Sequence, residues 1–312
     1  MKVELLRERL ESYHCRNSRE EEQAVREITQ ELILAGLSRT DLFSRAAFQG
    51  GTCLRIVHGV LRFSDDLDFA LFDPNQAFRW DAYGKAVSRE LSAYGYEIEV
   101  KEGRAEDGRA VKNTILRDDA ITKLLNFEYL GKAGVPKKVQ IKLEVDTNPP
   151  EGAWHDRAEL NFPYRFPIVV DDPATLFAGK LSALLCRPYE KGRDWYDFLW
   201  NVGKGNPINA PYLEATLQQI GPWKGQGVPV SERWLQATLH ERIDRIDWAA
   251  MRADILKFVR DEERLSVEAW TPETFHAATR HLEGQGLLRE QPGKKHLPDD
   301  DGPVGGKGSA RR

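Results

Sequence analysis

Alternation of apolar and polar residues is clearest between Val139 and Asp146. Every second side chain in this segment is apolar, and the residues between them are Gln140, Lys142, Glu144 and Asp146. A period of two predicts a β-strand with one buried face and one polar face. Apolar residues on both sides of Asp68 predict a second strand at 67–71. Shorter stretches typical of strands lie at 96–100, 110–116, 122–129 and 165–170, and we expect 110–116 and 122–129 to pair antiparallel.

Helical periodicity dominates the two ends of the chain. Residues 1–45 are predicted to form helices, the second of which begins with a capping box made by Ser18 and Glu21. Asp172 and Pro173 fit the N-cap and the first position of another helix. The remaining helices are predicted at 52–58, between 74 and 95, and at 173–186, 231–243, 248–260 and 272–283, with Gly- and Pro-rich connectors over 205–230.

The order of these elements predicts an α/β (α+β) protein, in which a core with a mixed β-sheet precedes an α-helical C-terminal domain. We expect helices over 1–45 that pack on the core, the sheet domain over 46–171, the helical domain over 172–283, and a disordered polar tail over 284–312. A chain of 312 residues is long enough for two domains.

Composition narrows the class of protein. Hydrophobic residues make up 41% of the chain and charged residues 30%, as in ordinary soluble proteins. The sequence has no apolar run of about 18 residues, and its charged start lacks the apolar core of a signal peptide. We therefore expect no membrane span and a cytoplasmic location. Three scattered cysteines argue against a disulfide framework, and a net charge of −4 argues against non-specific binding of nucleic acid over the whole surface.

Two groups of residues with ligand-binding chemistry lie within one short segment. Gly50, Gly51 and Thr52 begin a predicted helix, where free N–H groups are suited to phosphate. Asp66 and Asp68 lie two residues apart, so on a strand both carboxylates point to one face. A hard divalent cation such as Mg²⁺ relieves their mutual repulsion. A solvated acidic turn beside an ordinary glycine loop is the alternative, but the apolar neighbours of Asp68 favour a functional site.

Charged residues also interrupt the helical part of the chain. Lys180 lies in the middle of an apolar stripe, where an anion across an interdomain cleft explains it better than extension into water does. Asp194 and Asp197 share one helix face at i and i+3, and Arg193 can pair with Asp197 at i+4. Asp194 could instead cap its helix, so the residues alone leave its role open.

Several of these segments together resemble the AbiEii/MenT-type nucleotidyltransferase toxins of the DNA polymerase β-like superfamily. The similar motifs are Gly-Gly-Thr at 50–52, Arg-Phe-Ser-Asp-Asp-Leu-Asp-Phe at 62–69, Ala-Gly-Lys-Leu-Ser-Ala-Leu at 178–184 and Arg-Asp-Trp-Tyr-Asp at 193–197. The resemblance covers roughly residues 50 to 199. It implies a nucleotidyltransferase core followed by the helical domain, with the active site in the cleft between them.

The resemblance also implies a role for each candidate residue. Asp66 and Asp68 would hold Mg²⁺ or Mn²⁺ together with a third carboxylate from a neighbouring strand, for which Glu144 is preferred to Asp146. Lys180 would contact the triphosphate, and one of Asp194 and Asp197 would be catalytic. The remaining residues assigned to binding of the NTP co-substrate are Gly50, Gly51, Thr52, Ser64 and Arg193, although Ser64 could equally cap its turn.

The expected reaction is transfer of a nucleoside monophosphate from an NTP to an acceptor hydroxyl. In related toxins the acceptor is RNA, commonly tRNA, and a cognate antitoxin protein from a neighbouring gene is implied as a partner in toxin–antitoxin or phage-defence systems. Two other classes stay open. One is a nucleotidyltransferase of the same fold that modifies a small molecule such as an antibiotic, and the other is a nucleotide-binding regulator without turnover.

Overall fold

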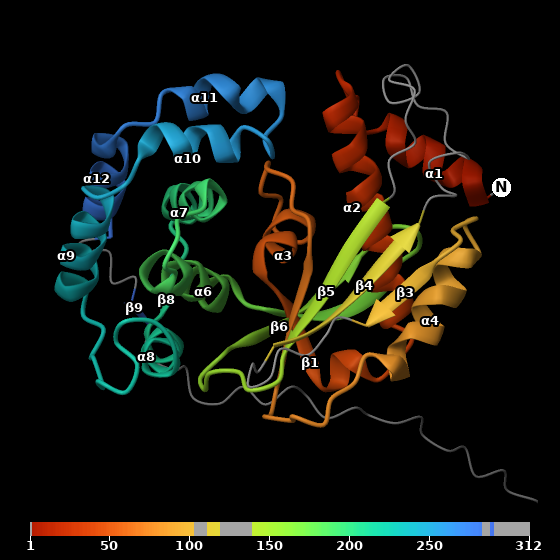
Figure 1. Ribbon diagram of the computed structural model, residues 1–312, viewed down its shortest axis with the longest axis horizontal. Coiled ribbons are helices and arrows are strands. Elements are labelled where there is room, and N and C mark those ends of the chain that lie inside the picture. Colours follow the sequence, from red (N-terminus) through yellow and green to blue (C-terminus); the bar gives the residue numbers. More distant parts are fainter. Residues whose placement is uncertain (1, 103–110, 119–138, 283–287, 290–312) are drawn as a thin grey trace, which may run out of the picture.

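The computed structural model describes residues 2–102, 111–118, 139–282 and 288–289 (Figure 1). A seven-stranded sheet forms its first half. From one edge to the other the strands are β3 (Glu99–Glu102), β4 (Val111–Asp118), β5 (Val139–Asp146), β2 (Leu67–Leu71), β1 (Ala46–Gln49), β7 (Phe166–Asp171) and β6 (His155–Leu160). The pairs β2–β5 and β1–β7 are parallel and the others antiparallel. The predicted α/β (α+β) class with a mixed sheet is confirmed.

Strand β5 has the two faces that its sequence predicts. Its four apolar side chains, at 139, 141, 143 and 145, are buried, and the polar side chains between them are half-buried or exposed. The strand contacts helix α2 (Ser18–Leu37), which is buried along nearly its whole length. The polar face, which carries Glu144, is therefore left for the pocket described below.

In the described residues the sheet is accompanied by helices α1 (Lys2–Glu11), α2, α3 (Gly50–Ile56) and α4 (Asp81–Ser92), with the short 3₁₀ turn η1 (Leu42–Ser44). Helix α2 packs against α4. The predicted capping box at Ser18 and Glu21 is wrong by one residue. Asn17 is the N-cap, because its side chain accepts a hydrogen bond from the Glu20 N–H.

The second half of the structure is helical (Figure 1). Its elements are α6 (Pro173–Cys186), α7 (Gly192–Lys204), α8 (Ala210–Gln219), α9 (Glu232–Ile243), α10 (Trp248–Ile255), η3 (Asp261–Glu263), α11 (Arg264–Glu268) and α12 (Pro272–Arg280). A short parallel ladder joins β8 (Ile208–Asn209) to β9 (Leu288–Arg289). As predicted, Asp172 caps α6 by accepting from the Thr175 N–H. No helix in the described part of the chain is both long and apolar enough to cross a membrane.

Two hydrophobic clusters meet inside helix α6. The first contains the buried faces of the sheet and its helices and extends as far as Leu176. The second begins at the next residue, Phe177, and contains the buried side chains of the helical half. The predicted boundary after residue 171 lies just before this helix. Helix α6 therefore contributes to both cores and fixes the position of one relative to the other.

Some predicted elements differ from those observed. Strands β1 and β6 were not among the predicted elements, α8 lies within the predicted connectors, and the strand predicted at 96–100 is observed at 99–102. The strand predicted at 110–116 exists as β4, but in the described residues its antiparallel partners are β3 and β5. The strand predicted at 122–129 lies outside the described residues, as does almost all of the predicted tail.

Candidate active site

Three carboxylates lie side by side at the centre of the sheet. Asp68 is in β2 and Glu144 in the neighbouring parallel strand β5, where the two residues are direct partners in the register. Asp66 comes just before β2 begins. All three line one pocket of about 110 Å³. The predicted third carboxylate Glu144 is thus beside the aspartate pair, whereas Asp146 does not line this pocket.

The pocket walls come from both halves of the molecule. Besides the carboxylates, they consist of Gly51, Arg62, Ser64, Lys180, Arg187, Lys191, Arg193 and Asp194. The first three belong to the segment around α3, and the others belong to α6, α7 and the connection between them. The pocket therefore places carboxylates on one side and mostly cationic side chains on the other.

The carboxylates are electrostatically unfavourable in the absence of a cation. Burial, followed by repulsion from Asp66 and Glu144, raises the pKa of Asp68 to about 6, although Lys180 opposes the shift. Burial and the neighbouring charges of Asp65 and Glu144 likewise raise the pKa of Asp66. Both aspartates would therefore gain from a positive charge placed between them.

The three carboxylates fit a divalent metal in their chemistry but not in their spacing. Oxygen donors and excess negative charge are the chemistry that Mg²⁺ and Mn²⁺ prefer. In the described part of the chain, however, no group of three or more His, Cys, Asp or Glu side chains is arranged closely enough to hold a metal ion. Glu144 is paired with Lys142, with 2.6 Å between Nζ and Oε1. The donors thus fit the metal chemically, but their present spacing does not form a complete coordination shell.

The glycine pair is required by close contacts. Gly50 has φ +77°, and a Cβ there would lie 2.5 Å from Asp68 Oδ2. A Cβ at Gly51 would lie 2.7 Å from Arg62 Nη2 and 3.0 Å from Ser64 Oγ. Glycine at both positions therefore allows the start of α3 to approach the carboxylates and the floor of the pocket.

Thr52 and Ser64 have different surroundings. The Thr52 side chain is fully buried, and its hydroxyl donates to the backbone carbonyl of Asp66. Thr52 thereby fixes the backbone that presents this carboxylate. Ser64 lines the pocket, and its carbonyl accepts a hydrogen bond from Gln30 in α2, at 3.1 Å.

Lys180, Asp197 and Arg62 form a buried charged cluster at the inner wall. Arg62 donates to both carboxylate oxygens of Asp197 at 2.5 Å, and both side chains are at most 1% exposed. Lys180 Nζ lies 2.9 Å from Asp197 Oδ2. Burial alone would raise the pKa of Asp197, but the two cations outweigh it and lower the pKa. Asp197 is therefore an ionised anchor for both cations.

Asp194 is also buried, but unlike Asp197 it belongs to the pocket wall. It lines the pocket, accepts an ion-pair contact from Arg187, and lies 3.5 Å from Lys180 Nζ. It is not the N-cap of α7, which is Lys191. The predicted pair between Arg193 and Asp197 is also wrong, since Arg193 Nη1 instead contacts Asp65 at 3.0 Å.

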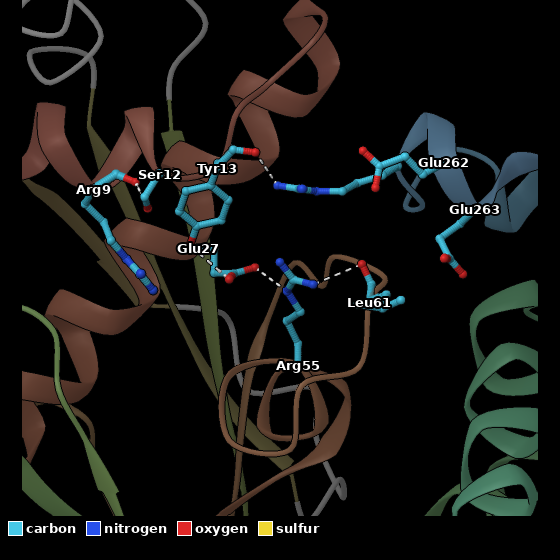
Figure 2. A pocket seen from close by; sticks show the side chains of 9 residues that line it. Arg9, Ser12, Tyr13, Glu27, Arg55, Leu61, Glu262 and Glu263 are labelled. Atoms are coloured by element: carbon cyan, nitrogen blue, oxygen red, sulfur yellow. Dashed lines mark hydrogen bonds and ion pairs between the residues drawn. The ribbon is translucent and has the colours of Figure 1, made fainter.

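A larger pocket of about 300 Å³ lies between the N-terminal helices and the η3 segment (Figure 2). Its charged groups bind one another: Glu27 accepts from the Tyr13 hydroxyl at 2.9 Å and from Arg55 Nε at 2.7 Å. Arg55 also donates to the carbonyls of Val60 and Leu61, and Arg260 donates to the Tyr13 carbonyl. Because these charged side chains are already engaged with neighbouring groups, size alone does not make this pocket the active site.

A comparison with family models matches residues 32–278 to the nucleotidyl transferase AbiEii toxin of type IV toxin–antitoxin systems. The chain belongs to this family. It is therefore a nucleotidyltransferase, and membership in a type IV toxin–antitoxin family implies an antitoxin partner. A comparison with curated proteins finds no match.

Two solved structures of Helicobacter pylori proteins are similar in part to the AbiEii-family chain. One, provisionally described as a nucleotidyltransferase, is 16% identical, with a TM-score of 0.44, over 81% of this chain and 89% of the other. The second, JHP933, is 15% identical, with a TM-score of 0.43, over 84% of this chain and 89% of the other.

The AbiEii-family site also contains residues to which the sequence analysis assigned no role. Arg62, Arg187 and Lys191 line the pocket, and Lys142 pairs with Glu144. Arg62 lies in the matching motif two residues before Ser64, so its position was a usable signal. Arg187 and Lys191 lie shortly before the Arg-Asp-Trp-Tyr-Asp motif in the sequence. This position could have indicated that they line the same pocket.

Proposed function

We propose that this chain transfers a nucleoside monophosphate from an NTP to a hydroxyl at the 3′ end of an RNA, with tRNA as the first candidate, in a reaction that requires Mg²⁺ or Mn²⁺. One observation carries the proposal: a single pocket sets three carboxylates opposite several cations. Carboxylates alone suit a metal, and cations alone suit phosphate. A metal–triphosphate complex needs both.

The residues that would hold the metal are Asp66, Asp68 and Glu144. When bound, the metal lowers the pKa of the acceptor hydroxyl and offsets negative charge on the leaving pyrophosphate. The reaction forms a bond from the acceptor oxygen to the α-phosphorus and breaks the bond from that phosphorus to the bridging oxygen of pyrophosphate. Lys180 and Arg193 supply positive charge that favours the triphosphate and its more highly charged transition state.

The two aspartates of α7 have different roles in this proposal. Asp194 lines the pocket and is placed to touch the substrate. Asp197 is fully buried, and both of its oxygens contact cations. Asp197 is therefore a positioning residue that holds Lys180 and Arg62 in place.

The RNA acceptor, a protein antitoxin from a neighbouring gene, a role in phage defence and a cytoplasmic location are parts of the same proposal. They are supported by membership in a family of toxin–antitoxin nucleotidyltransferases. Blocking the 3′ ends of tRNA would stop translation and so explain toxicity.

The test is to incubate the purified protein with each labelled NTP and Mg²⁺ or Mn²⁺, with total RNA or with aminoglycosides as acceptors. We expect label in RNA, located by mass spectrometry of 3′ ends, and none with the Asp66→Asn/Asp68→Asn variant. Label found only in the aminoglycoside would show that the acceptor is a small molecule and that the proposed RNA acceptor is wrong. An absence of turnover with every NTP and both metals would identify a nucleotide-binding regulator instead.

A further inference from the structure

The connection between α6 and α7 presents an exposed aromatic ring between two residues that line the candidate active-site pocket. Arg187 and Lys191 line the pocket, and Tyr189 lies between them in sequence, 57% exposed. Among the exposed large hydrophobic side chains of the described residues, Tyr189 is the one aromatic; the others are Leu61, Val111, Ile220 and Leu265. A single exposed ring is ordinary on a protein surface, so its surroundings decide what it does.

The backbone on both sides of this ring is firmly attached. The Arg187 carbonyl accepts from Arg242 Nη2 at 2.7 Å, and the same nitrogen lies 2.6 Å from Glu190 Oε1. The Gly192 N–H donates to Asp254 at 2.9 Å. A loop held at both ends loses little conformational entropy when a ligand binds to it. Tyr189 is thus an exposed ring on a preorganised support.

The charges beside the ring suit a nucleotide. Lys191 Nζ lies 5.7 Å from the centroid of the Tyr189 ring, and Arg187 extends into the pocket toward Asp194. An aromatic ring that stacks a base, next to cations that attract its phosphates, is the usual arrangement for binding unpaired nucleotides.

The size of the pocket leaves the base of a bound nucleotide outside it. A volume of about 110 Å³ is below the roughly 300–1,000 Å³ of pockets that enclose drug-sized ligands. A nucleotide whose phosphates occupy the pocket therefore extends beyond it, and the 187–191 connection forms part of the wall along which it can do so.

We propose that Tyr189 is a stacking platform for an unpaired nucleobase, carried either by the NTP or by the nucleotide that bears the acceptor hydroxyl. The inference rests on the proposed function, because it takes the pocket to hold phosphate. Stacking of one base on an aromatic side chain contributes about 1–3 kcal/mol, which is about a 5- to 150-fold change in affinity.

The test compares Tyr189→Phe, Tyr189→Leu and Tyr189→Ala in the full chain. Equilibrium dissociation constants are measured in Mg²⁺, separately for each NTP and for a labelled short single-stranded RNA, so that no nucleotide is transferred during the measurement. We expect Leu and Ala to weaken binding of at least one probe by about 5- to 150-fold, and Phe to retain it. Leu265→Ala, which removes a side chain 78% exposed in α11, is the control and should change neither constant.

The outcomes separate the two sources of the base and the two proposals. Weaker binding of the NTP alone assigns the ring to the donor base, and weaker binding of RNA alone assigns it to the acceptor base. Parental affinity for every probe in Tyr189→Leu would overturn the inference, even if the parent transfers nucleotides to RNA. Conversely, the parent could fail to label RNA while Tyr189→Leu binds NTP more weakly than the parent does. That result would support the inference and reject the proposed acceptor.

Discussion

Replacement of Asp68 by asparagine should stabilise the protein in the absence of ligand. Burial and the neighbouring carboxylates raise the pKa of Asp68 from 3.8 to about 6, and one pKa unit corresponds to about 1.4 kcal/mol. Below pH 3.8 the group is protonated in both states and costs nothing. As the pH rises through about 6, the cost of ionising it in the folded state grows to about 3 kcal/mol. Asparagine nearly preserves the shape and removes this cost.

The measurement is urea denaturation in EDTA at about pH 4 and about pH 7.5. The Asp68→Asn variant should gain less than about 1 kcal/mol at the lower pH and about 3 kcal/mol at the higher one. The exposed Asp73 provides the control, since Asp73→Asn removes the same charge outside the pocket. The variant should also lose the stabilisation that Mg²⁺ with NTP gives the parent. An equal gain at both pH values, or lower stability near neutral pH, would refute the electrostatic reasoning.

Two further substitutions test the inner wall of the pocket. Lys180→Met keeps the length of the side chain and should lower NTP affinity or turnover by about one to several factors of ten, each about 1.4 kcal/mol. Steady-state kinetics on the folded variant would show this, and parental kinetics would contradict it. Asp197→Asn should lower the free energy of unfolding, measured by urea denaturation, by about 3–5 kcal/mol, because buried Arg62 loses its charged partner. Asp194→Asn should abolish activity and lower the free energy of unfolding much less. Equal destabilisation by both would reject the division of roles.

The sequence predicted those strands whose pattern is local. Strand β5 is long and half-buried, so its alternation is complete, and Asp68 has apolar neighbours on both sides in β2. Strand β1 has only four residues, too few to show a period. Strand β6 lies at the sheet edge, where most of its side chains are exposed or half-buried, so burial did not select an apolar face.

The candidate site was predictable where a motif carried it and unpredictable where tertiary contacts did. The aspartate pair and Lys180 were found from spacing and from the apolar stripe. The hydrogen-bonded ion pair between Arg62 and Asp197 joins residues 135 positions apart, and no local sequence pattern predicts a partner at that distance. Arg193 was assigned to Asp197 by helix geometry, but the fold places Asp65 within reach, at 3.0 Å. Helix spacing predicts ion pairs between residues that are close in sequence, whereas the folded chain forms them between residues that are close in space.

The same bond has a consequence for the synthesis of the toxin. The ribosome makes the segment with the aspartate pair and Arg62 first, and it makes Asp197 135 residues after Arg62. At about 5–20 residues per second, this interval is about 7–27 seconds. Until then Arg62 lacks the anion that permits its burial, and the wall that carries Lys180 has no anchor. A nascent chain therefore holds the aspartate pair before the inner wall of the pocket can form, and the pocket is complete only after helix α7 has been added.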